Sequence, residues 1–342
     1  MNTKTQRPTL KTISDLTGLA VPTVSRALSG AQDIGEKTRK RVQEVAKEIG
    51  YVPNRAGVRL RTGRSYVVSL VLSTEADVMN LTAKLINSVA AGLRGTRYNL
   101  TITPVFPDED PMIPIRNIVE TRAADAVILN QTQPEDPRVI YLMKQGFPFA
   151  THGRTKFADH HDYYDFDNRT LGHIAVKRLL SRGRRKFALL APPRNQFYGM
   201  EIVAGARAEA SKAGVSLKVV DGATSDSPAA DIEKAVEPLL DRSGYAADAI
   251  ITASSASCMA CVSAVERLRL NVAQEVDLFS KEAMPFLTKF RPGILTQFED
   301  AAAAGTFLAQ AVLRRLETPD EPLMQHLSVP HLDTDLTAKS ES

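Results

Sequence analysis

From residue 66 onward the chain alternates short apolar runs with longer amphipathic stretches, and it does so twice. The first series contains YVVSLVLS, LTAKLINSVAAGLRG, NLTITPVF, PIRNIVETRAA and DAVILN, and the second contains KFALLAP, MEIVAGARAEASKAG, SLKVVDG, DIEKAVEPLLDRSG and DAIITAS. Strands and helices that alternate in this way build parallel sheets through right-handed βαβ units. The pattern predicts an α/β body of two doubly wound parallel-sheet subdomains, with a ligand site in the cleft at the carboxyl ends of the strands.

The segment before this body has a helical pattern instead. Within TLKTISDLTGLAVPTVSRALSG, apolar residues recur at helical spacing at Leu10, Ile13 and Leu16, and again after Gly18. This spacing predicts two short helices joined by a glycine turn. GEKTRKRVQEVAKEIG predicts a third helix with one apolar face and basic residues on the others. Three short helices can share one small core, so we expect a separate N-terminal domain.

Pro22 fixes the start of the second helix. A proline is tolerated only in the first turn of a helix, which places the start near Ala20 or Val21. Val24, Ala27 and Leu28 can then face the core. The side chains left for solvent are Val21, Pro22, Thr23, Ser25 and Arg26. This start of the helix is the end that helix-turn-helix proteins insert into the major groove.

The charge is distributed unevenly along the chain. Residues 1–64 contain 13 lysines and arginines and five acidic residues, a net charge of +8, whereas the whole chain carries only +4. The remaining 278 residues therefore carry −4. A basic module on a mildly acidic body is typical of a protein that binds a polyanion through the module.

TISDLTGLAVPTVSRALSG, followed by TRKRVQEVAKEIGYVPNRAGVRLRTGRS, resembles the DNA-binding head of the LacI/GalR family of bacterial transcription regulators. The family signature pairs a T-V-S-R helix with a later Y-x-P-N and a leucine six residues beyond that asparagine. The resemblance implies a homodimer, palindromic operator DNA as partner and a small-molecule effector, a sugar or sugar derivative. It gives base reading to Val21, Pro22 and Arg26, and phosphate contacts to Thr9, Thr23, Ser25 and Asn54.

Two departures from the family pattern concern helix stability. Ala20 stands where the family usually has a serine N-cap, a loss that costs the second helix about 1 kcal/mol. The basic linker PNRAGVRLRTGRS corresponds to the family's hinge helix, whose leucine wedges into the minor groove, and Leu60 has that position. Gly57 replaces a common alanine there, so we expect it to make ordering of the hinge less favourable by about 1 kcal/mol.

The resemblance extends over the body, through DFDNRTLGHIAVKRLLSRGRRKFALL and RPGILTQFEDAAAAGTFLAQAVLRRL. Here Ile202 replaces the family's ligand-clamping arginine and Ser257 replaces its aspartate, which puts the usual sugar pose in doubt. Lys281 stands where an acid is usual; it suggests an anionic ligand such as a sugar acid or phosphate, although a solvated loop lysine is the favoured interpretation. The residues expected to line the cleft are Asp77, Gln131, Arg154, Tyr198, Ser257, Lys281 and Gln297.

These patterns give the following domain organisation. We expect a helix-turn-helix DNA-binding domain over residues 1–53, a hinge over 54–65 and an effector-binding and dimerisation domain over 66–335. Within the last, the subdomain boundary should lie near residue 165, with chain crossings near 296 and 320. Residues 336–342 are polar and should form a disordered tail.

Two other classes of protein are compatible with the body alone. A transport receptor would need a signal sequence, which MNTKTQRPTLKTISDL does not resemble, and no apolar run reaches the roughly 18 residues of a membrane helix, so we expect a cytoplasmic protein. An enzyme could use Cys258 and Cys261 as a thiol pair, but their position predicts buried core residues. His160, His161 and Asp162 are expected at the surface or the cleft rim rather than on a metal. We therefore predict a transcription regulator, a repressor as the resemblance implies, without cofactor, metal or catalytic residues.

Overall fold

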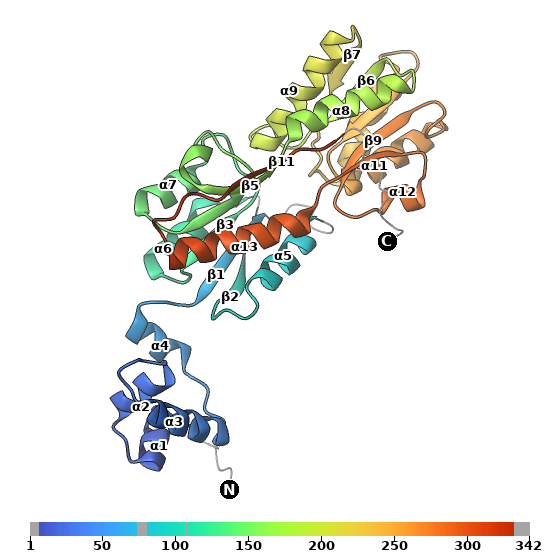
Figure 1. The fold of residues 1–342 in the computed structure, drawn as a ribbon. Helices are drawn as coiled ribbons and strands as arrows, with labels where there is room; N and C mark the ends of the chain where they lie inside the picture. Colours follow the sequence, from blue (N-terminus) through green and yellow to red (C-terminus); the bar gives the residue numbers. More distant parts are fainter. Residues whose placement is uncertain (1–6, 74–80, 107, 332–342) are drawn as a thin grey trace. The chain divides into compact units, whose positions relative to one another are not determined.

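The computed structural model describes residues 7–73, 81–106 and 108–331. The chain divides into two compact units, Met1–Ser65 and Tyr66–Ser342. We call the first unit the head and the second the body, and each is described by itself (Figure 1). The predicted tail over residues 336–342 lies outside the described residues.

The head has three helices around one small apolar core, and a fourth helix follows them. The helices are α1 (Leu10–Thr17), α2 (Val21–Leu28), α3 (Glu36–Glu48) and α4 (Arg55–Thr62). The buried core consists of Ile13, Val24, Ala27, Val42 and Ala46. Gly18 ends α1 with a φ of 70°, a left-handed conformation that glycine adopts without strain. The predicted helix, glycine turn and helix are confirmed, although Leu16 is 57% exposed and takes no part in the core.

The first subdomain of the body is a parallel sheet of six strands. The strands are β1 (Val67–Ser73), β2 (Asn99–Val105), β3 (Ala126–Leu129), β4 (Phe149–His152), β5 (Asp162–Phe166) and β11 (Gln325–Ser328), in the order β11-β5-β4-β3-β1-β2. Its helices are α5 (Leu81–Gly92), α6 (Met112–Thr121), α7 (Pro137–Gln145) and α13 (Ala301–Glu317), and a short 3-10 helix covers Ala158–His160. The inner residues of β1 are all buried, as expected for an apolar strand with helices on both faces.

The second subdomain is a parallel sheet of five strands. The strands are β6 (Lys186–Leu190), β7 (Ser216–Val219), β8 (Ala249–Thr252), β9 (Asp277–Glu282) and β10 (Leu295–Phe298), in the order β10-β9-β8-β6-β7. Its helices are α8 (Asn168–Ser181), α9 (Phe197–Lys212), α10 (Ala229–Leu240), α11 (Ser255–Arg267) and α12 (Leu287–Phe290). The two doubly wound parallel sheets predicted from the alternating pattern are confirmed.

The chain passes from the first sheet to the second after β5 and returns after β10. The return is clear because α13 lies beside α5 against the first sheet (Figure 1), where Ala304, Leu308 and Val312 fill the core. Strand β11 also pairs in the first sheet, with β5. The chain therefore stays in the first subdomain at residue 320, and the crossing expected there is not observed.

Candidate functional site

The N-terminal end of α2 is exposed and lacks a side-chain cap. Its N-cap residue is Ala20, whose methyl group accepts no hydrogen bond, and Pro22 lies in the first turn. The helix therefore begins where Pro22 predicted. Without this cap, no N-cap side chain accepts hydrogen bonds from the first backbone N–H groups of α2.

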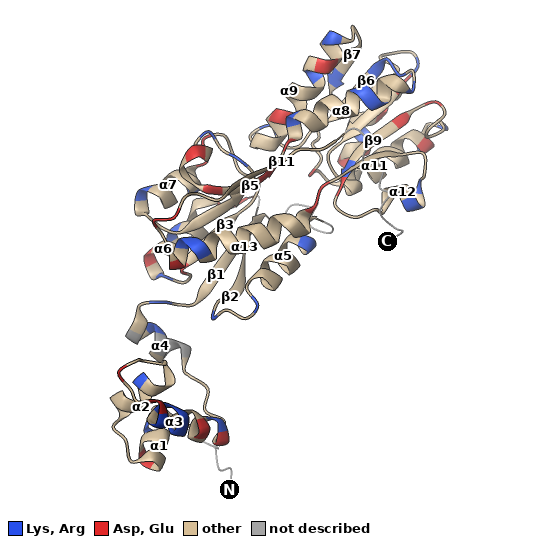
Figure 2. Cartoon of the chain, in the orientation of Figure 1, with Lys and Arg blue, Asp and Glu red and all other residues tan. Residues whose placement is uncertain are grey.

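The outer face of α2 presents the side chains expected there from the sequence. Val24 and Ala27 are fully buried, whereas Val21 is 37% exposed. Pro22 and Arg26 are also exposed, and Thr23 and Ser25 are partly exposed. Arg26 forms an ion pair with Asp33, which lies between α2 and α3. Basic residues continue along α3, as Figure 2 shows, at Lys37, Arg39, Lys40 and Arg41.

The remaining DNA-contact candidates of the head lie at helix starts and on α4. Thr9 is the N-cap of α1 and shares a capping box with Thr12. Asn54 is exposed directly before α4. On α4, Leu60 is 90% exposed, and a Cβ added to Gly57 would meet no atom within 4 Å. The helix therefore presents a large apolar side chain to solvent, and close packing does not require a glycine at position 57.

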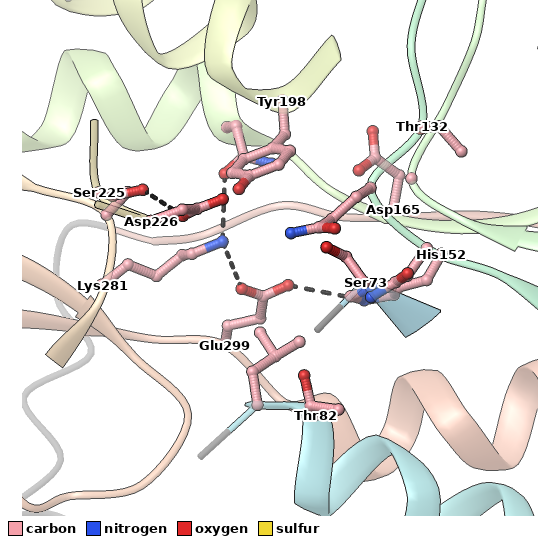
Figure 3. A pocket seen from close by; sticks show the side chains of 16 residues that line it. Ser73, Thr82, Thr132, His152, Asp165, Tyr198, Ser225, Asp226, Lys281 and Glu299 are labelled. Carbon is pink, nitrogen blue, oxygen red and sulfur yellow. Dashed lines mark hydrogen bonds and ion pairs between the residues drawn. The ribbon is translucent and has the colours of Figure 1, made fainter. Parts of the chain in front are cut away.

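The body contains a polar cavity between its two subdomains, of about 800 Å³ including space open to solvent. Its lining consists of Ser73, Leu81, Thr82, Asn130, Gln131, Thr132, His152, Gly153, Asp165, Asn168, Tyr198, Ser225, Asp226, Ala253, Lys281 and Glu299 (Figure 3). Nearly all of these residues lie at or just after the carboxyl ends of strands, or at the start of the helices that follow. Parallel sheets present ligand sites at this edge. We call this cavity the cleft.

A buried ion pair lies at the centre of the cleft. Lys281 Nζ is 2.6 Å from Glu299 Oε2 and 3.5 Å from Asn168 Oδ1. The ammonium group also lies over the rings of Tyr198 and Phe166, 5.4 and 5.5 Å from their centroids. Lys281 is only 8% exposed, so the favoured interpretation of it as a solvated loop lysine is wrong. The reason is that β9 continues through this position and Glu299 supplies a counter-charge inside.

Two further groups adjoin this ion pair. Glu299 Oε1 lies 3.7 Å from His152 Nε2, and burial lowers the pKa of His152, which favours the neutral imidazole. Asp165 Oδ2 accepts a 2.6 Å hydrogen bond from Arg154 Nε. Burial nevertheless raises the pKa of Asp165 to about 6, against the lowering effect of Arg154. The cleft thus holds several ionisable groups, and burial shifts the pKa values of His152 and Asp165 toward their neutral forms.

On the side of the second subdomain, Asp226 faces the cleft from the loop after β7. Its Oδ1 accepts a 2.8 Å hydrogen bond from Ser225 Oγ, while its Oδ2 is buried and accepts none from the described residues. Burial raises the pKa of this carboxyl group. On the side of the first subdomain, Asn130 Oδ1 is likewise buried without a donor among the described residues.

Direct contacts join the two subdomains beside the cleft. Phe197 N donates a 2.8 Å hydrogen bond to Thr132 O, and the guanidinium of Arg154 lies 5.8 Å from the centroid of the Phe197 ring. Lys84 on α5 donates a hydrogen bond to Ala283 O, after β9. These contacts connect the two subdomains beside the cleft.

The cleft brings together only some of the residues expected from the sequence. Gln131, Tyr198 and Lys281 line it, and Arg154 holds the lining residue Asp165. Ser257 is fully buried and donates to Ser254 O within its own helix start, so it does not line the cavity. Gln297 is buried on β10 and is also outside the lining. Asp77 lies outside the described residues.

Several polar residues of the cleft lining were not predicted from the sequence, and most of them lie near the carboxyl end of a strand. They are Asn130, His152, Asp165, Asn168, Asp226 and Glu299. A signal for them existed in AVILN, FATH, DYYDFDN and LTQFED, because a polar residue at the carboxyl end of a parallel strand points to this edge of the sheet. Asp226 has no such signal, since six residues separate it from the end of β7.

The other candidate groups have structural roles. Cys258 and Cys261 are fully buried in an apolar cluster, and burial raises the pKa of Cys258 to about 12. His160 is exposed as expected, but His161 and Asp162 are buried. Asp162 accepts hydrogen bonds from Arg315, and His161 lies 3.0 Å from Thr155 Oγ1. Within the described residues no group of three or more His, Cys, Asp or Glu residues could hold a metal ion, and no helix is long and apolar enough to cross a membrane.

Comparison with known proteins identifies two matching family models. Residues 9–54 match the model of bacterial regulatory proteins of the lacI family. Residues 81–326 match the model described as periplasmic binding proteins and sugar binding domain of the LacI family. The two matches cover the head and most of the body.

Similar proteins were found among curated sequences and solved structures. The HTH-type transcriptional regulator AglR of Rhizobium meliloti is 27% identical, over 92% of this chain and 90% of its own length. CelR of Thermobifida fusca is 27% identical, over 91% and 92%. The structure of a CelR–cellobiose complex matches with a TM-score of 0.69 and 23% identity, over 95% of this chain and 98% of that chain. The Lac repressor dimer bound to operator and the anti-inducer ONPF matches with a TM-score of 0.79 and 16% identity, over 95% and 97%, and at these identities the two structures show a shared fold.

Proposed function

Because the chain belongs to the LacI family of bacterial regulatory proteins, we propose that it is a cytoplasmic repressor whose head binds operator DNA and whose cleft binds a sugar or sugar derivative. The observation that carries the proposal is the exposed side of the head: the start of α2 and Leu60 of α4 offer base-reading and wedging side chains that no described residue covers. The cleft supplies a second, separate site. Two sites in one chain are what ligand-controlled DNA binding requires.

Within the head, each candidate has a distinct proposed task. Arg26 would hydrogen-bond to a guanine edge and Val21 and Pro22 would contact thymine methyl groups. Thr9, Thr23, Ser25 and Asn54 would fix the register through phosphates. Arg26 must exchange its ion pair with Asp33 for the DNA, which is possible because exposed ion pairs contribute only about 0–1 kcal/mol.

We propose a homodimer that reads a palindrome, since one helix-turn-helix unit reads only a half-site. Each subunit would place Leu60 at the centre of the operator. Two basic heads on one duplex displace many counterions, so operator affinity should fall steeply with salt. A ligand that prefers one arrangement of the two subdomains would change operator affinity through a coupling of about 1–3 kcal/mol.

The first test is operator binding by fluorescence anisotropy, with DNA from upstream of the protein's own gene and the adjacent genes, over a salt series. Tight binding that resists unrelated competitor DNA is expected. Leu60→Ala should weaken it about tenfold, because the wedge that stabilises the bent duplex is lost. Gly57→Ala should strengthen it about fivefold, because alanine favours the helix by about 1 kcal/mol and meets no neighbouring atom.

Leu16→Ala is the matched control, since Leu16 is an exposed leucine of the head outside the proposed surface. It should leave affinity unchanged. Weak binding that is equal on all sequences, or equal effects of Leu60→Ala and Leu16→Ala, would contradict the proposal. An enzymatic alternative based on the two buried thiols is addressed by the double variant Cys258→Ser/Cys261→Ser, which should retain full DNA binding.

A further inference from the structure

The positive charge in the cleft is already compensated by the protein. Lys281 Nζ pairs with Glu299 at 2.6 Å, and two aromatic faces and the Asn168 amide oxygen complete its surroundings. A buried ammonium with a carboxylate partner is neutral as a pair, so it offers little attraction to an incoming anion. The lysine therefore does not support a sugar acid or phosphate as ligand.

The other charged side chains of the described lining are acidic. Besides Glu299, the carboxylates Asp165 and Asp226 line the cavity, and Lys281 is the one lysine or arginine among the described residues that line it. Arg154 neutralises Asp165 from outside the lining, at 2.6 Å. Asp226 forms no direct ion pair among the described residues: Ser225 Oγ donates a hydrogen bond to it, and Lys281 acts on its charge only from a greater distance. A second anion in this partly desolvated space would meet net repulsion.

Two of the unused hydrogen-bonding atoms on the walls, one on each side, are acceptors. Asn130 is only 7% exposed, lines the cavity, and its Oδ1 has no donor among the described residues. Asp226 Oδ2 is in the same situation. A buried acceptor without a donor is unfavourable, so a ligand that brings donors relieves both atoms when it binds.

The two acceptors belong to different subdomains. Asn130 follows β3 of the first sheet directly, whereas Asp226 lies in the loop between β7 and α10 of the second. Figure 3 shows Asp226 on the opposite side of the cleft from Thr132, the near neighbour of Asn130 in sequence. One ligand that donates to both atoms would join the two walls.

We propose that the ligand of the cleft is an uncharged polyhydroxyl compound, a neutral saccharide, whose hydroxyl groups donate to Asn130 Oδ1 and Asp226 Oδ2, and that the site rejects anionic derivatives of the same sugar. This inference rests on the proposed function only in taking the cleft as the effector site. Hydroxyl groups fit better than an ammonium group, since Lys281 already occupies the cationic position between the aromatic rings and Glu299.

The test compares matched ligands on the full-length protein by isothermal titration calorimetry, without DNA. The probes are glucose, galactose, maltose and cellobiose, together with the uronic acid of each, in which one CH₂OH group becomes a carboxylate, and the neutral uronamide. At least one neutral sugar should bind, and its uronic acid should bind at least 50-fold more weakly. The affinity of its uronamide should be closer to that of the sugar than to that of the uronic acid. Equal or tighter binding of a uronic acid, or no binding by any of the neutral sugars, overturns the inference.

The second arm is Asp226→Asn, which keeps the size of the side chain and removes its charge. Affinity for the neutral sugar should fall at least tenfold, and discrimination against the uronic acid should narrow. Asp221→Asn is the control, because Asp221 is exposed in the same connection and pairs with Arg194 on the surface. If both variants bind the sugar equally, Asp226 is not a ligand contact and the inference is wrong.

Operator binding is measured separately, with each ligand that binds. An anionic ligand that changes operator affinity would refute the inference and support the proposed function. A neutral sugar that binds as described but leaves operator affinity unchanged would support the inference and contradict the proposed function. The two failures are therefore distinguishable.

Discussion

Asp165 shows how one side chain of the cleft is tied to the stability of the body. It is 5% exposed, and burial raises its pKa from a usual 3.8 to about 6 although Arg154 donates to it. The folded chain therefore holds this proton more tightly than the unfolded chain does. Stability from this group is complete below about pH 4 and is lost as the pH rises through about 6.

Replacing Asp165 by asparagine should remove this pH dependence. Relative to Asp165→Asn, the wild-type free energy of unfolding should fall by up to about 3 kcal/mol between pH 4 and pH 7. Urea denaturation at several pH values measures the difference. Asp221→Asn should follow the wild type, because Asp221 is exposed. If the difference in free energy of unfolding between Asp165→Asn and wild type does not change between pH 4 and pH 7, the Asp165 carboxyl is ionised over that whole range and the prediction is wrong.

At this scale the sequence predicted contacts between neighbours better than contacts between distant residues. Gln131 lies just after β3 and Tyr198 lies in the first turn of α9, and both positions belong to the edge of a parallel sheet where ligands bind. The burial of Lys281 could not be predicted, because it depends on Glu299, which reaches the same cavity from another strand. Ser257 was expected in the cleft but does not line the cavity, because it is buried at the start of α11 and its hydroxyl donates to Ser254 O.

At the scale of elements, close helix packing explains glycines that the sequence alone left unexplained. A Cβ on Gly205 of α9 would lie 2.0 Å from Arg169 O of α8, and one on Gly172 of α8 would lie 2.4 Å from Ile202 O of α9. Both obstacles are backbone atoms, which cannot rotate away. The two helices therefore touch backbone to backbone, directly beside the second sheet and the cleft.

Gly205→Ala should consequently destabilise the body by about 3 kcal/mol, since α8 and α9 must separate to admit the methyl group. Gly244→Ala is the control in the same subdomain, because a Cβ there meets its nearest atom at an ordinary 3.7 Å. It should change stability by less than about 0.5 kcal/mol. Thermal unfolding followed by circular dichroism compares the two. Equal stability of both variants would mean that α8 and α9 can separate without loss of stability, and would contradict the prediction.

The elements themselves were largely predictable, because local signals decide them. Pro22 fixed the start of α2, Gly18 the end of α1, and the alternating apolar runs the parallel strands. The connection near residue 320 was not predictable, since the pairing of β11 with β5 joins segments about 160 residues apart. Local periodicity contains no information on such a pairing.

At the scale of the whole molecule, the chain consists of two units of very different size. The buried core of the head comprises five residues, whereas the body has four apolar clusters that each contain ten or more. A small core gives marginal stability, and unfolding of one unit need not disturb the other. The net charge of +8 on residues 1–64 lowers the stability of the head further through self-repulsion.

Differential scanning calorimetry of the full chain should therefore show two transitions, the head first. Operator DNA should raise the midpoint temperature of the first transition, because it binds the folded head and neutralises its charge. A neutral sugar that binds the cleft, at 100 times its Kd, should stabilise the body by about 2.7 kcal/mol. It should therefore raise mainly the midpoint temperature of the second transition. Unrelated DNA of equal length is the control for the first and a uronic acid for the second. A single transition whose midpoint temperature both ligands raise equally would mean that head and body unfold as one unit, and would contradict their independent stability.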